Sequence, residues 1–136
     1  MIKKNKTITF LFTLLIIIEI FYFSSIPGNQ ELGTRGNQWI PRVYHFTVFF
    51  LFSFFLFATT SQKDIKTKQI ILVIILSVTQ AFLDEIHQLF VPFRSSSFSD
   101  ILTNSLGIFS AILIYIYINK NQAQGLNPSP SFLGKR

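Results

Sequence analysis

The sequence predicts an all-α fold, a polytopic membrane protein built as a bundle of four transmembrane helices. Of its 136 residues, 49% are hydrophobic and only 13% are charged, whereas an ordinary soluble domain carries roughly 25% charged residues. A soluble protein with so little charge would lack the polar groups to cover its surface, so lipid is the expected solvent. The mean hydropathy of +0.45 agrees, and four long apolar stretches follow one another along the chain.

The four apolar stretches comprise residues 8–24, 43–60, 70–91 and 101–118. As a helix, each falls within the range of roughly 17–25 residues that crosses the hydrocarbon core of a bilayer. Their many β-branched and aromatic residues would favour strands in water. Lipid, however, leaves no partner for the unpaired backbone groups of an open sheet, so we expect four helices.

The first stretch also has the basic flank of a secretory signal, since Lys3, Lys4 and Lys6 precede it. No small-residue cleavage site follows it, however, and Glu19 interrupts its apolar run. Both features argue against cleavage, so we expect an uncleaved first helix.

The segments between these stretches are polar and rich in residues that favour turns. Residues 25–42 contain several Gly, Pro and Asn residues, residues 61–69 form a polar turn, and residues 92–99 form a tight Pro/Ser loop. The chain ends in a segment rich in Pro, Ser and Gly. We therefore expect one transmembrane domain over residues 1–120, followed by a disordered cytoplasmic tail over residues 121–136.

The basic residues predict which side of the membrane each connection faces. Four crossings place both termini and the 61–69 turn on one side, which leaves only Arg35, Arg42 and Arg94 of the 12 Lys and Arg residues on the other. Because cytoplasmic segments of membrane proteins are enriched in Lys and Arg, we expect both termini in the cytoplasm and the protein in the plasma membrane. The same distribution accounts for the net charge of +6 without a nucleic-acid partner, so membrane lipids are the expected partners.

The third stretch ends in a group of polar residues that lipid alone would not stabilise. These residues are Gln80, Asp84, Glu85, His87 and Gln88. At 3.6 residues per turn all but Glu85 share a face, and Glu85 lies about 100° round the helix from Asp84. A charged side chain in a membrane helix costs at least about 2.5–3.5 kcal/mol at the bilayer centre. Two adjacent acids near a His therefore need compensation, either in a functional pocket or by structural pairing between helices.

Polar residues at the same predicted depth lie in the neighbouring stretches. His45 stands in the first turn of the second stretch, Arg94 follows the third, and Asp100 and Asn104 open the fourth. Because four short helices leave little lateral room, we expect Glu85, His45, Arg94 and Asp100 to meet in one outward-facing cluster. The plainer alternatives are that Asp100 only caps a helix, that Arg94 anchors the chain at the interface and that His45 lies among the headgroups.

The fourth stretch also carries a stripe of small residues. Gly107 and Ala111 follow Asn104 at helical spacing. Such a stripe lets two helices pack closely, so we expect this face of the fourth helix to lie inside the bundle.

The order of the polar residues resembles that of the VanZ-like family of bacterial and archaeal membrane proteins. That family carries a D-E-x-x-Q-x-x-x-x-x-R motif followed by Ser and by D-x-x-x-N, and a His at the start of its second helix. The matching residues are Asp84, Glu85, Gln88, Arg94, Asp100, Asn104 and His45, with Ser24, Ser25 and Pro27 after the first stretch. The chain departs from the pattern in having Phe93 where Gly is common, and Arg42 as the basic residue nearest to His45. The resemblance covers roughly residues 10–118.

This resemblance implies a four-helix fold, a membrane location and a role in the cell envelope. The family takes its name from a protein associated with teicoplanin resistance, so antibiotic resistance is implied only as a family label. No shared biochemical activity follows from membership, which leaves open whether the protein is an enzyme.

The first function open to the polar residues is a site at the outer leaflet that binds or modifies a lipid headgroup or a cell-wall precursor. Glu85 or Asp84 would act as general base, with His45 or His87 as the proton partner, and Asp100 completes the candidate catalytic set. The candidate ligand-binding residues are Arg94, Gln88, His87 and Asn104, and the Arg94 guanidinium suits a phosphate or carboxylate.

The same carboxylates and imidazoles are compatible with a divalent metal, although their spacing matches no specific metal signature and no other cofactor is evident. The chain has no Cys, which excludes thiolate metal sites and disulfides.

The second function is non-enzymatic: the polar group would bind an envelope lipid or antibiotic, or hold the helices together, without turnover. A proton or ion path is the weakest alternative, because polar residues on one side of the membrane form no continuous path.

Overall fold

The computed structural model describes residues 5–28, 39–60, 65–94 and 97–126. Over these residues the chain forms four helices: α1 (Lys6–Ser24), α2 (Trp39–Thr60), α3 (Thr67–Leu89) and α4 (Phe98–Leu126). Each of them contains a window long and apolar enough to cross a membrane. The predicted all-α fold with four membrane helices is therefore confirmed.

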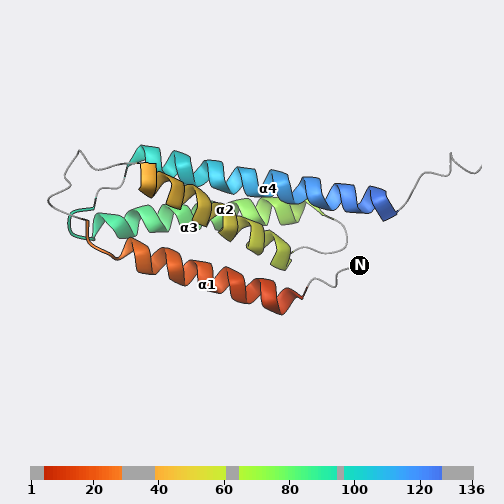
Figure 1. The fold of residues 1–136 in the computed structure, drawn as a ribbon, viewed down its shortest axis with the longest axis horizontal. Helices are drawn as coiled ribbons and strands as arrows, with labels where there is room; N and C mark the ends of the chain where they lie inside the picture. The colour runs from red at the N-terminus through yellow and green to blue at the C-terminus, as the bar shows by residue number, and fades with distance from the viewer. Residues whose placement is uncertain (1–4, 29–38, 61–64, 95–96, 127–136) are drawn as a thin grey trace, which may run out of the picture.

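Consecutive helices run in opposite directions along one elongated bundle (Figure 1). The start of α1, the end of α2, the start of α3 and the end of α4 lie at one end of the bundle. The other end, which we call the distal end, holds the end of α1 at Ser24, the start of α2, the end of α3 at Leu89 and the start of α4. This is the alternation expected of four membrane crossings.

The helices extend beyond the apolar stretches that predicted them. α2 begins at Trp39, within the predicted 25–42 loop, because Pro41 is compatible with the first turn of a helix. α3 begins at Thr67, within the predicted 61–69 turn. There the Lys66 backbone N–H donates to Gln69 Oε1 at 3.0 Å, which satisfies a backbone donor at the helix start.

The fourth helix differs most from its prediction. α4 begins at Phe98 and continues to Leu126, so it includes residues 121–126 of the predicted tail. The reason is that Lys, Gln and Ala are good helix formers, and extending an existing helix needs no new nucleation. Residues 127–136, the rest of the predicted tail, lie outside the described residues.

Large apolar side chains fill the bundle and also cover its outer surface. Phe49 and Ile108 are fully buried between the helices, whereas Phe82 and Leu113 are 60% and 68% exposed. A surface with this much exposed hydrocarbon is unusual for a protein in water and suits a lipid solvent.

The helices α2 and α4 pack backbone to backbone at Gly107. A Cβ at this position would overlap the Phe46 carbonyl oxygen and lie 3.1 Å from the Phe50 nitrogen, both in α2. Asn104 and Ala111, on the same face of α4, are fully buried. The predicted inward stripe of small residues is therefore confirmed, and α2 is the helix that it meets.

The chain segments leaving α1 and α3 contact each other at the distal end. The Gly28 N–H donates to the Pro92 carbonyl oxygen at 3.0 Å, and a Cβ at Gly28 would lie 2.6 Å from the Phe93 carbonyl carbon. Phe93 itself has a positive φ of 58°, which is uncommon for a bulky residue. This close contact holds the ends of α1 and α3 together beside the polar residues described next.

Candidate functional site

A network of buried polar side chains lies near the distal end of the bundle. Its members come from all four helices and each is at most 5% exposed: Ser24, His45, Asp84, Glu85, Gln88 and Asn104. Each lies within about two helical turns of the distal end of its helix, at 3.6 residues per turn. The tertiary fold thus collects these side chains at one depth.

The Asp84 carboxylate is the centre of this network. The Ser24 hydroxyl donates a hydrogen bond to Asp84 Oδ1, and Gln88 Nε2 donates to Oδ2 at 2.9 Å. The His45 Nδ1 atom lies 3.9 Å from the same Oδ2. One carboxylate therefore connects α1, α2 and α3.

Asn104 extends the network to α4 by bridging His45 and Glu85. Its Oδ1 atom lies 3.1 Å from His45 Nδ1, and its Nδ2 donates to Glu85 Oε1 at 3.4 Å. Because an amide oxygen only accepts, His45 carries a proton on Nδ1 in this arrangement. The imidazole thus lies 3.9 Å from the Asp84 carboxylate and is linked to the Glu85 carboxylate through the Asn104 amide.

The same three residues form a candidate metal centre. One ligand atom each from His45, Asp84 and Glu85 lies within 4.8 Å of the others, and all three side chains are buried. Carboxylate oxygens and an imidazole nitrogen that carries no proton suit Zn²⁺ or Mn²⁺. An ion bound through His45 Nδ1 would therefore replace the proton that this atom shares with Asn104. The hydrogen bonds from Ser24 and Asn104 would then orient the carboxylates, as outer partners of metal ligands usually do.

His87 lies outside this network, although it shares a helix face with Asp84. Its Nε2 atom is 3.0 Å from the Ser25 hydroxyl, and its ring contacts that of Phe21 with 4.8 Å between centroids. Both contacts are with residues at the end of α1, and His87 is only partly buried.

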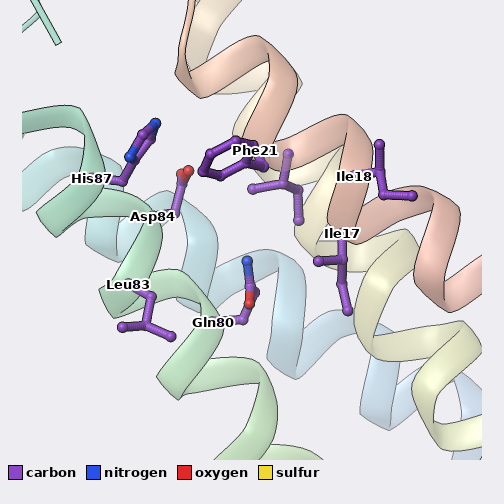
Figure 2. Close-up of a pocket in the computed structure, with 8 residues that line it drawn as sticks. Ile17, Ile18, Phe21, Gln80, Leu83, Asp84 and His87 are labelled. Atoms are coloured by element: carbon purple, nitrogen blue, oxygen red, sulfur yellow. The ribbon is translucent and has the colours of Figure 1, made fainter.

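A groove between α1 and α3 runs beside His87 and reaches Asp84. It has a volume of about 440 Å³. Figure 2 shows Phe21 and Ile17 from α1 on one side and Leu83, Asp84 and His87 from α3 on the other. The full lining is Ile17, Ile18, Ile20, Phe21, Gln80, Leu83, Asp84 and His87. An apolar groove thus leads to the central carboxylate of the buried network.

The other two residues of the predicted cluster are Asp100 and Arg94. The Asp100 backbone N–H donates to Ser97 Oγ at 3.2 Å, and the Ser97 hydroxyl donates to Asp100 Oδ2 at 2.7 Å. Asp100 thus takes part in a helix cap, as the alternative interpretation has it. The Arg94 side chain is partly buried, and no carboxylate of the described residues forms an ion pair with it. The structure brings His45 and Glu85 together, while the inclusion of Arg94 and Asp100 in one cluster stays a prediction.

Some polar residues of the interior have roles that the sequence does not reveal. Ser24 matches a family pattern, but nothing in the order of the residues indicates that it donates to Asp84 on another helix. Ser53 and Ser77 form a buried hydrogen bond of 2.9 Å between α2 and α3. The Tyr44 hydroxyl is buried without a hydrogen-bond partner among the described residues. Serines inside apolar runs on neighbouring helices are a weak signal for such pairs.

Comparison with known proteins identifies a family for this chain. A family model described as VanZ/LLP1 matches residues 6–119. These residues include all four helices up to Asn119 and every member of the buried network. No curated protein and no solved structure was found to match the chain.

Proposed function

This chain belongs to the VanZ/LLP1 family, and we propose that it is an integral protein of the cell envelope whose buried network binds the polar part of an envelope lipid or a cell-wall precursor. The observation that carries the proposal is the pair of adjacent buried carboxylates, Asp84 and Glu85, beside the His45 imidazole. Packing four helices needs no such pair. Burying carboxylates is costly unless bonds to the charged form compensate, so sites of this kind are more often functional than structural.

The chemistry of the site suits a ligand that offers hydroxyl or amine protons. Asp84 and Glu85 can accept them, and His45 lies near both carboxylates, where its imidazole can take up and release a proton. If the protein turns over its ligand, one of these carboxylates is the general base and His45 its proton partner. A divalent ion on the same three residues would supply Lewis-acid chemistry.

Arg94 would bind an anionic part of the same ligand. It follows α3 at the distal end, it is partly buried, and no carboxylate of the described residues pairs with it. A guanidinium binds phosphate or carboxylate groups through two parallel hydrogen bonds. A cell-wall precursor would connect such a site with the teicoplanin resistance from which the family takes its name.

The proposed orientation places the distal end at the outer surface of the plasma membrane. It is supported by the excess of Lys and Arg at the opposite end, where cytoplasmic segments usually carry them. The site would then face the compartment in which the cell wall is assembled.

The experiment is ligand binding and turnover by the full chain in lipid nanodiscs. Candidate envelope lipids are offered with and without Mn²⁺ or Zn²⁺, to the native protein and to Glu85→Gln and Arg94→Lys. We expect both variants to lose binding or turnover at least tenfold and to keep the native melting temperature, because Gln preserves shape and Lys preserves charge. Glu19→Gln is the matched control, since Glu19 is exposed on α1 and lies outside the network.

The second candidate is a purely structural role for the network, without a ligand. It is favoured by the hydrogen bond that Asp84 receives from Ser24, which already links α1 to α3, and by the one that it receives from Gln88 within α3. In that case Glu85→Gln and Arg94→Lys would change activity only in proportion to lost stability. Melting curves measured beside the binding assay separate the two functions, and unchanged binding in both variants would refute the ligand site.

A further inference from the structure

We infer that the groove between α1 and α3 holds the hydrocarbon chain of a membrane lipid, whose headgroup donates a hydrogen bond to Asp84. This inference rests on the proposed function and names its substrate class: a lipid that reaches the site sideways from the bilayer, rather than a soluble molecule arriving from outside. The juxtaposition that supports it is an apolar groove on the membrane-facing surface with a buried carboxylate in its wall.

The groove is open toward lipid. Three of the residues that line it, Ile18, Phe21 and Leu83, are 53–63% exposed, and the helices that carry them are membrane spans. The lining extends on α3 from Gln80 to His87, about 10 Å at about 1.5 Å per residue. Because the surroundings of these helices are hydrocarbon, the chain of a neighbouring lipid is the molecule that can fill the groove without displacing water.

The wall of the groove also carries polar groups, which hydrocarbon alone would leave unsatisfied. The Asp84 side chain lines the groove although it is only 2% exposed. Ser24 donates to one oxygen of this carboxylate and Gln88 to the other. An ionised carboxylate can accept about four hydrogen bonds, so it has acceptor sites left. A headgroup hydroxyl or amine near Asp84, toward the distal end of the groove, would donate a further hydrogen bond to this carboxylate. A headgroup without a donor would not.

His87 indicates that the headgroup would lie at the distal end of the groove. Its ring lies against Phe21 and its Nε2 atom is held by Ser25, so the imidazole is fixed at the distal rim. Figure 2 shows His87 beside Asp84, with Gln80 and Leu83 further along α3. A lipid seated here would have its head beside His87 and its chain along Ile17 and Leu83.

The test is photolabelling by two lipids that differ only in the headgroup. The full-length protein is placed in phosphatidylcholine vesicles that contain a trace of a lipid with a photoreactive diazirine in its acyl chain. One probe is a phosphatidylglycerol, whose headgroup hydroxyls donate, and the other is a phosphatidylcholine, which has no donor. The measured quantity is the saturable fraction of protein that carries one adduct, determined by intact mass.

Two matched variants separate groove binding from ordinary lipid contact. Leu83→Trp fills the groove from α3, and Leu76→Trp makes the same change on the same helix at an exposed position outside the lining. Ile18→Trp fills the groove from α1 and replaces Leu83→Trp if that variant melts below the control. We expect saturable labelling by the phosphatidylglycerol probe in the native protein and in Leu76→Trp. Filling the groove should reduce it roughly tenfold, and Asp84→Asn should do the same, the loss expected for one hydrogen bond to a charged group.

Three outcomes would overturn the inference. The first is equal labelling of Leu83→Trp and Leu76→Trp, which would mean that the groove holds no specific chain. The second is equal saturable labelling by both probes, because Asp84 would then select nothing. The third is a dimer of the native protein that dissociates in Leu83→Trp, since a second copy would then occupy the groove.

The proposed function can survive this failure, and the variants show whether it does. If Leu83→Trp keeps the ligand binding that Asp84→Asn loses, the network is a site reached from outside and only the lateral groove is wrong. If Asp84→Asn keeps both ligand binding and saturable labelling, the site and the groove are wrong together.

Discussion

The substitution Gly107→Leu tests the contact on which the bundle depends most directly. Gly107 lies against α2, where a Cβ would overlap the Phe46 carbonyl oxygen and lie 3.3 Å from its carbonyl carbon. The neighbouring atoms are backbone, which cannot rotate away as a side chain can. Any side chain at this position must therefore push α4 away from α2.

The size of the effect follows from two opposing contributions. Overpacking a tight interface costs typically 1–3 kcal/mol and sometimes more, and a gap of about 0.5–1 Å forfeits roughly a quarter to a half of the dispersion attraction across it. Replacing a helical Gly recovers about 0.8–1 kcal/mol of helix propensity. With Leu the overpacking is at the upper end of its range, so we expect a net destabilisation of about 2 kcal/mol. That corresponds to a fall in melting temperature of roughly 5–10 °C for a chain of this size.

The assay is thermal unfolding in detergent followed by helical circular dichroism, with recovery of monodisperse protein as a second measure. Leu106→Phe is the control, because it enlarges the adjacent residue of α4 at a position that is 62% exposed. An unchanged melting temperature in Gly107→Leu, relative to that control, would refute the packing of α4 on α2 through this face.

The remaining predictions concern topology, the distal contact and the bridging amide. A Cys placed at Lys66 should react with a membrane-impermeant reagent only after the cells are lysed, because this residue is expected on the cytoplasmic side. Labelling from outside intact cells would contradict the proposed orientation. The native chain, which has no Cys, is the control. Gly28→Ala should lower the melting temperature, because the new methyl group would lie 2.6 Å from the Phe93 carbonyl carbon, and an unchanged value would mean that the contact between the α1 and α3 ends contributes nothing. Asn104→Leu should destabilise the protein by about 1–3 kcal/mol, the cost of leaving buried polar partners such as Glu85 unsatisfied; equal stability would mean that water or an ion replaces the amide.

The sequence by itself determined the class of the fold. Hydrophobicity acts locally, since about twenty consecutive apolar residues are enough to make a membrane helix whatever its neighbours are. The four spans were therefore predictable to within a few residues at most ends. Where the prediction of an end failed, as at Leu126 and Trp39, polar helix formers or a Pro compatible with the first turn extend the helix beyond its apolar stretch.

The candidate site was predictable as a set of residues and a depth, but not as a set of contacts. Periodicity placed Asp84, His87 and Gln88 on one face of α3, and the structure divides that face between the network and the groove. Only the tertiary structure shows that Asp84 receives its hydrogen bond from Ser24. Likewise, only the structure shows that Asn104, rather than Asp100, connects α4 to the acids.

The physical reason is that pairing between helices depends on their rotation and on which of them are neighbours. Both are fixed by close packing, such as that of Gly107 on the α2 backbone. Lipid does little to select one helix rotation over another, because it solvates apolar side chains as well as the protein interior does. What composition and length decided is that these helices lie in a membrane, and what packing decided is that Asp84 lies at once in a buried network and in the wall of a groove open to lipid.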